Sequence, residues 1–170
     1  MTHQLAGAMI YLGKKADSIE DGVAMSRQAI DDGSAFLKFV DITAEQGGEV
    51  DFLYHPEKYP EAQSSFNITA DADGYISRMN AYDFGMAAVE LGAGRAVKED
   101  IVDPVSGISL SKKVGDLVKK GETIAVCFTN KTGIKNAVRQ RLVNSLDISG
   151  EESVARPMIA SMLTGSNVES

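Results

Sequence analysis

The chain has 170 residues, 44% of them hydrophobic, which is enough for one domain with a real core or for one and a half small ones. Its formal net charge of −7 argues against general nucleic-acid binding through a basic surface, and no apolar run approaches the roughly 18 residues that a membrane-spanning helix needs. A single cysteine and an N-terminus without the basic start and long apolar block of a signal peptide favour a reducing, cytoplasmic setting.

Three short helices are predicted in the first part of the chain. Residues 2–13 are apolar on nearly every side, which is typical of a helix in a protein interior, so this start suggests a cut partway through a larger domain. The second helix is expected to begin at Ser18, with Asp21 in the place of the Glu or Gln of a capping box, and to end at Gly33. The third is expected to begin at a Ser34 cap and to end at a pair of glycines. The brief connections predict an antiparallel helical layer.

The rest of the chain predicts strands mixed with two helices. The expected strands cover residues 65–69, 75–79, 108–110, 117–118, 123–128 and 154–163, and the expected helices cover 81–91 and 135–146. Asn80 is the candidate N-cap of the first of these helices, and Gly92 is expected to close it. Residues 115–126 are predicted to be two strands paired around a tight turn.

Residues 51–60 contain two prolines and mark the best domain boundary. The sequence thus predicts an α+β protein. Residues 1–60 would form a short helical layer, and residues 61–163 a small mixed β domain of the barrel-sandwich type. Residues 164–170 are expected to form a disordered tail.

Two features around the predicted helix end could carry chemistry. Gly92-Ala93-Gly94 is half of a dinucleotide-binding fingerprint, but a helix precedes it where a strand is required and the third glycine is missing. A helix end followed by a tight loop is the better interpretation. The acidic cluster of Glu99, Asp100 and Asp103 could bind a cation or act as an acid–base pair, although a charge run of this kind is more often a solvated loop.

Four isolated side chains are further candidates. The predicted strand pair at 115–126 resembles that of biotinyl and lipoyl carrier domains, but Lys131 lacks the flanking residues of a carrier lysine, so a carrier role is disfavoured. Cys127 lies in an apolar strand with no His in this half of the chain, and we expect a buried structural thiol. Arg78 and Arg95 could hold a phosphate or carboxylate, although single arginines more often have a surface role.

Several stretches together resemble one family. They are GYIS at 74–77, GMAAVELGAGR at 85–95, KED at 98–100, Asp103 with VSG at 105–107, KKVGDLVKKGE at 112–122 and, upstream, MIYLG at 9–13, Glu20-Asp21 and AEQGG at 44–48. These motifs are similar to the C-terminal domain of the pyrimidine-nucleoside and thymidine phosphorylases and to the stretch just before it. The resemblance extends to about Asn130.

The resemblance implies a pentosyltransferase of nucleoside salvage, in which residues 1–60 would be the helical end of the large α/β domain. Such an enzyme splits a pyrimidine nucleoside with phosphate into the free base and (deoxy)ribose 1-phosphate, needs no cofactor, and is a homodimer whose domains close on the substrates. The family's phosphate loop and base-binding residues precede the matching region. We therefore expect no catalytic or substrate-binding residue in this chain, and no activity without an N-terminal catalytic part. A freestanding interaction or regulatory module derived from such an enzyme is the alternative.

Two smaller expectations follow from the resemblance. Family members can hold a cation near the segment that matches the first helices, so Glu20 or Asp21, with backbone carbonyls of residues 9–12, would be this chain's share of the ligands. Residues 95–107 match a region that can order when the enzyme closes, and we expect a mobile loop at a domain interface. The candidate residues of this loop are Arg95, Asp100 and Asp103.

Overall fold

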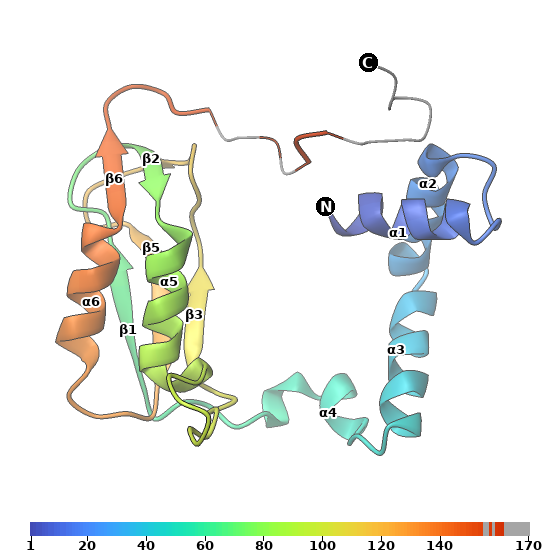
Figure 1. Ribbon diagram of the computed structural model, residues 1–170, viewed down its shortest axis with the longest axis horizontal. Coiled ribbons are helices and arrows are strands. Elements are labelled where there is room, and N and C mark those ends of the chain that lie inside the picture. The colour runs from blue at the N-terminus through green and yellow to red at the C-terminus, as the bar shows by residue number, and fades with distance from the viewer. Residues whose placement is uncertain (155–156, 158, 162–170) are drawn as a thin grey trace. The chain divides into compact units, whose positions relative to one another are not determined.

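A computed structural model describes residues 1–154, 157 and 159–161 (Figure 1). The chain divides into two compact units, which we call the helical unit, containing Met1–Tyr59, and the sheet unit, containing residues 60–154. The predicted tail at 164–170 lies outside the described residues. So does part of the predicted strand at 154–163, and the residues described within it are not in a strand.

The helical unit is built from consecutive short helices. Their bounds are α1 Thr2–Leu12, α2 Ile19–Asp31, α3 Ser34–Glu45, α4 Asp51–Tyr54 and the 3₁₀ turn η1 Pro56–Lys58. The predicted cap of α2 is confirmed, because Ser18 Oγ accepts a hydrogen bond from the Asp21 amide at 3.0 Å and donates one to its carboxylate at 2.7 Å. The predicted Ser34 cap is wrong. Gly33 is the N-cap of α3 with φ 79°, and the Ser34 amide instead donates to the Asp32 carboxylate, which tightens the turn.

Glycines form the contact between α1 and α2. Gly7 and Gly22 are the buried residues of the helical unit among those the structure describes. A Cβ atom on Gly22 would lie 2.3 Å from the carbonyl oxygen of Gly7, so the two backbones touch. The large apolar side chains of α1 point elsewhere, and Met9 is 73% exposed. The predicted helix is therefore present, but in this chain its apolar surface is not in an interior.

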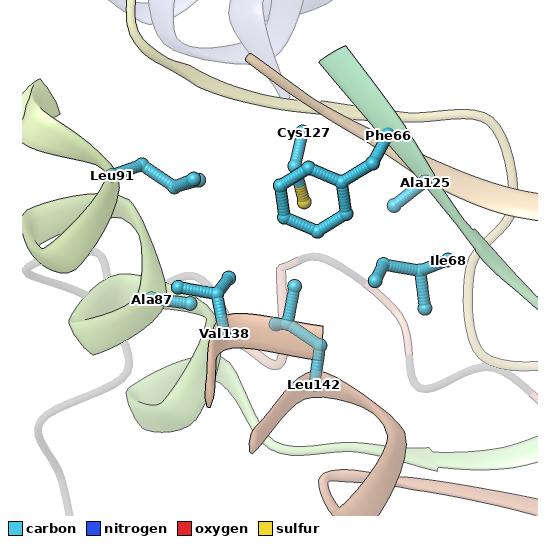
Figure 2. Packing of buried hydrophobic residues seen from close by; sticks show 8 residues of the cluster. All are labelled: Phe66, Ile68, Ala87, Leu91, Ala125, Cys127, Val138 and Leu142. Carbon is cyan, nitrogen blue, oxygen red and sulfur yellow. The ribbon is translucent and has the colours of Figure 1, made fainter. Parts of the chain in front are cut away.

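In the sheet unit, two helices cover one face of a three-stranded antiparallel sheet. The strand order is β1 (Ser64–Thr69), β5 (Thr123–Thr129) and β3 (Gly107–Leu110), and the helices are α5 (Ala81–Ala88) and α6 (Lys135–Asn144). Figure 2 shows the core between these layers, in which Phe66 and Cys127 from the strands face Leu91, Val138 and Leu142 from the helical side. Alternating apolar residues on β1 and β5 and helical spacing on α6 supply this core.

A second three-stranded antiparallel sheet has the order β4 (Leu117–Val118), β2 (Gly74–Met79) and β6 (Leu146–Ser149). Its core cluster joins Ile76 and Val118 to Ala70 and Ile124. The α+β class is confirmed. The barrel-sandwich prediction is not supported, because the described strands form two separate sheets and neither of them closes.

Two predictions about strands are wrong. Residues 115–126 do not form a hairpin, because β4 pairs with β2 while β5 pairs with β1 and β3. The strand β6 is a further difference: the helix expected at 135–146 ends at Asn144, and Leu146 begins β6, which the sequence does not predict. No helix within the described ranges is both long and apolar enough to cross a membrane.

Candidate functional site

The glycine-rich segment ends a helix, as predicted. Asn80 Oδ1 accepts a hydrogen bond from the Tyr82 amide at 3.1 Å and begins α5, which continues directly into the π-helical turn η2, Val89–Ala93. Gly92 has φ 116°, a conformation that residues with a side chain rarely adopt. A Cβ atom there would also lie 3.4 Å from that of Asp103, so the chain that leaves η2 folds back closely onto it.

Three consecutive carbonyl groups at the end of this helix receive hydrogen bonds from outside it. Glu90 O accepts from Lys131 Nζ at 3.1 Å, Leu91 O from the buried Thr129 Oγ1 at 2.7 Å, and Gly92 O from the Asp103 amide at 2.9 Å. Carbonyls at a helix end have no partner inside the helix, so each must find a donor elsewhere. Lys131 is therefore a helix-end donor rather than a lysine presented at a hairpin tip.

The loop of residues 95–106, which follows η2, is held by its own carboxylates. Asp100 Oδ2 accepts from the amides of Val97 at 3.1 Å and Ala96 at 2.9 Å. Asp103 accepts from Ser106 Oγ at 2.7 Å and from the Val105 amide at 3.2 Å. These hydrogen bonds hold the pKa of each carboxyl below its usual range. The acidic cluster thus organises the loop backbone.

An apolar tip stands on this loop. Val97, Ile101 and Val102 are all exposed, and Ile101 is 91% exposed. Arg95 is also exposed, and its charge lowers the pKa of Asp100. These three side chains give the loop an apolar, solvent-exposed surface in this chain.

Acidification is expected to loosen this loop while the core remains folded. The pKa of Asp100 and that of Asp103 are lower in the folded protein than the ordinary value of 3.8. Their contribution to stability is therefore complete above pH 3.8 and is lost as the pH falls through the folded pKa. Amide NMR shifts of Val97 and Val105 should follow this transition, with β5 amides as the reference.

The variants Asp100→Asn and Asp103→Asn should each remove the pH response of the amides that the lost carboxylate binds. Asp71→Asn is the control, since Asp71 is exposed and its side chain makes no hydrogen bond or ion pair within the described part of the chain. A loop transition centred above pH 3.8 would contradict the assignment.

The cation candidates Glu20 and Asp21 lie in the first turn of α2, in the helical unit, and the Asp21 carboxylate accepts from Ser18 Oγ. The loop candidates Arg95, Asp100 and Asp103 lie in the sheet unit, so the two sets belong to different units. No group of three or more His, Cys, Asp and Glu side chains placed to hold a metal occurs in the residues that the structure describes.

The remaining candidate groups have structural partners. Cys127 is buried, and burial raises the pKa of its thiol to about 11, so it is not a thiolate at neutral pH. Arg78 pairs with Asp147, on the neighbouring strand β6. The sequence did not indicate Arg141, whose guanidinium lies 2.7 Å from Glu90 Oε1 and 3.3 Å from Asp83 Oδ1. Its partners lie more than fifty residues away in sequence, which no local pattern reveals.

Comparison with known proteins places these features in a family. Residues 75–149 match the family model described as the pyrimidine nucleoside phosphorylase C-terminal domain. The chain is 39% identical over 155 residues to the pyrimidine-nucleoside phosphorylase of Geobacillus stearothermophilus, a match that covers 91% of this chain and 36% of the relative. It is 35% identical over 160 residues to that of Staphylococcus aureus (strain bovine RF122 / ET3-1), covering 94% of this chain and 36% of the relative.

The matched region is thus almost the whole of this chain but only 36% of the length of these curated relatives. The predicted resemblance is confirmed, because the matching family model is itself that of a C-terminal domain. The chain belongs to the pyrimidine-nucleoside phosphorylase family, in which it corresponds to the C-terminal portion.

Proposed function

We propose that this chain serves as the C-terminal portion of an enzyme that splits pyrimidine nucleosides with phosphate into free base and (deoxy)ribose 1-phosphate, and that it has no activity alone. The observation that carries the proposal is the match to pyrimidine-nucleoside phosphorylases over 91% of the chain but 36% of the relative. A cytoplasmic setting is proposed with it, because the lone buried thiol of Cys127 suits a reducing compartment.

The chemistry of the described side chains supports a non-catalytic role. Phosphorolysis needs groups that bind phosphate and base and that stabilise the charge developing between them. Here Asp100 and Asp103 bind loop amides, Lys131 binds a helix carbonyl, and Cys127 is buried and protonated. We therefore propose that the catalytic groups come from an N-terminal part of the enzyme.

The exposed apolar surface of the helical unit also supports an N-terminal part of the enzyme as the partner of this chain. Its buried residues among those described are two glycines, Gly7 and Gly22, and glycines contribute no side chain to a core. Large apolar side chains of α1 and α3 are exposed instead: Leu5, Met9, Leu12, Phe36, Leu37, Phe39 and Ile42. Short helices derive most of their stability from packing an apolar face, so this layer needs a covering surface. We propose that the N-terminal part of the enzyme supplies it, within a homodimer.

Two further roles belong to the proposal. The loop of residues 95–106 is an interface loop, with Val97, Ile101 and Val102 docking on the N-terminal part when the domains close. Glu20 and Asp21 would share a cation with oxygen ligands outside this chain, since two neighbouring carboxylates are too few for a hard cation.

Reconstitution tests the proposal. The purified chain, given thymidine or uridine with phosphate, is expected to release no thymine or uracil above background. Addition of the N-terminal part of a homologous pyrimidine-nucleoside phosphorylase, the portion that this chain does not match, is expected to produce phosphate-dependent turnover. The matched control adds residues 60–154 alone, which lack the helical unit and should reconstitute less activity.

Turnover by the chain alone would contradict the assignment of catalysis to the N-terminal part. Absence of reconstitution, together with tight binding to an unrelated protein, would favour the alternative of a freestanding interaction module. The exposed apolar surface predicts binding of a hydrophobic dye by the isolated chain and its loss in the reconstituted complex.

A further inference from the structure

The loop that follows η2 begins and ends on that same turn. At its beginning, Gly94 packs so closely on η2 that a Cβ atom there would lie 2.8 Å from Val89 Cγ2. At its end, the Asp103 amide donates a hydrogen bond to Gly92 O at 2.9 Å. A Cβ atom on Gly92 would also lie 3.3 Å from Ser106 Oγ. The chain therefore leaves η2 and returns to it, which is the arrangement of an Ω-loop.

The returning end of this loop has a network of hydrogen bonds of its own. The Asp103 carboxylate accepts from the Val105 amide at 3.2 Å and from Ser106 Oγ at 2.7 Å, and the Ser106 amide donates to Asp103 O at 3.3 Å. All three residues are half-buried. These bonds fix the backbone around Asp103, whose amide is the donor to Gly92 O. The Asp103 carboxylate therefore supports the hydrogen bond that joins the loop to η2.

The outer part of the loop is apolar and is also closed by hydrogen bonds. Asp100 Oδ2 accepts from the amides of Ala96 and Val97, and the Asp100 amide donates to Val97 O at 3.2 Å. Ile101 follows this turn directly and is 91% exposed. A large apolar side chain thus stands in solvent between two hydrogen-bonded turns, one centred on Asp100 and the other on Asp103.

We propose that this loop is a preformed docking element. In it, Asp103 is a positioning residue that holds the loop on η2, and Ile101 is the side chain that enters an apolar pocket of the N-terminal part of the enzyme. The proposal rests on the proposed function, which gives the loop this partner. It adds which side chain makes the main contact and that the loop already has its bound shape in the free chain. A preformed loop avoids the ordering cost of a segment that folds only on contact.

Residue-resolved amide exchange of the whole free chain tests the preformed shape. After correction for intrinsic rates, the Asp103 amide is expected to exchange about tenfold more slowly than the Ile101 amide, which has no acceptor among the described residues. Asp103→Ala keeps the backbone amide but removes the carboxylate, so exchange at position 103 should rise about three- to tenfold. Asp103→Asn keeps an acceptor and should restore most of the protection.

Glu99→Ala is the matched control within the same loop, because Glu99 is exposed and its side chain makes no hydrogen bond or ion pair in the described part of the chain. It should leave exchange at position 103 unchanged, and β5 amides should be unchanged in every variant. Equal exchange of the Asp103 and Ile101 amides in the unsubstituted chain would overturn the preformed loop. Unchanged exchange in Asp103→Ala would do the same for the positioning role.

Binding to the N-terminal part of a homologous pyrimidine-nucleoside phosphorylase tests the docking residue. Ile101→Ser is expected to weaken binding about ten- to hundredfold, the loss for a large apolar side chain that becomes buried, while exchange at position 103 of the free chain stays the same. Leu117→Ser is the control, because Leu117 is apolar, lies on β4 and is 57% exposed, and it should not alter binding.

Equal effects of these two substitutions, or no effect of Ile101→Ser, would overturn the docking role. If the unsubstituted chain does not bind the N-terminal part at all, the proposed function and the docking role fail together. The exchange rates in the free chain decide separately whether the loop is preformed.

Discussion

Replacing Leu142 by Ala is expected to lower the free energy of unfolding of the sheet unit by about 2–5 kcal/mol. Leu142 is completely buried on α6 and packs in the cluster that joins both helices to β1 and β5 (Figure 2). Deleting its branched end loses the free energy gained by burying those carbons. It also leaves a cavity between α6 and the strands that it packs against. Single domains are stable by only about 5–15 kcal/mol, so this loss is large.

Urea unfolding followed by far-UV circular dichroism measures this effect, since the chain has no tryptophan. Exchange of β5 amides assigns the change to the sheet unit. Val143→Ala is the matched control on the same helix, because Val143 is 37% exposed and should cost less than about 1 kcal/mol. Equal losses in the two variants would show that α6 does not pack as described.

Gly22→Ala is expected to separate α1 from α2. Alanine normally favours a helix over glycine by about 0.5–1 kcal/mol, so helix propensity alone predicts a gain. The new Cβ would lie 2.3 Å from the carbonyl oxygen of Gly7 and 2.9 Å from its Cα, and backbone atoms cannot rotate away. Overpacking of this kind costs about 1–3 kcal/mol or more, and the helical unit has no side-chain core to absorb it.

Gly85→Ala is the control that measures the effect of helix propensity alone. Gly85 lies inside α5 with nothing within 4 Å of its Cβ position, so this substitution should stabilise the sheet unit by about 0.5–1 kcal/mol. Exchange in α1 and α2 should rise sharply in Gly22→Ala and remain unchanged in Gly85→Ala. If Gly22→Ala instead protects these helices, the close glycine contact does not exist in solution.

Local signals predicted most of the elements. The Ser18 and Asn80 caps begin α2 and α5 as expected, since a cap depends on a side chain and an amide two or three residues away. Alternation of apolar residues predicted β1, and a continuous apolar run predicted β5 and the burial of Cys127 within it. The family was also recognisable from motifs of contiguous residues, which the match at 75–149 confirms.

The roles of the site residues were less predictable. Asp100 and Asp103 were expected in a solvated loop, and the amides they bind lie within four residues, so this part was close to what a sequence pattern can indicate. From the sequence, Lys131 could be assessed only as a candidate carrier lysine, and its neighbouring residues do not suit that role. Its partner, Glu90 O, is 41 residues away, and a backbone carbonyl carries no sequence signature.

The sequence by itself determined the helices, most strands, the caps at Ser18 and Asn80, and the family, because each depends on neighbouring residues or on a contiguous motif. Only the tertiary structure decided that β4 and β5 enter different sheets, that Leu146 begins β6, and that Lys131, Thr129 and Arg141 hold the end of η2. Strand pairing and helix-end hydrogen bonds join groups that are distant in sequence. Several strands or donors could satisfy each of these backbone groups equally well, and the packing of the core decides which of them does.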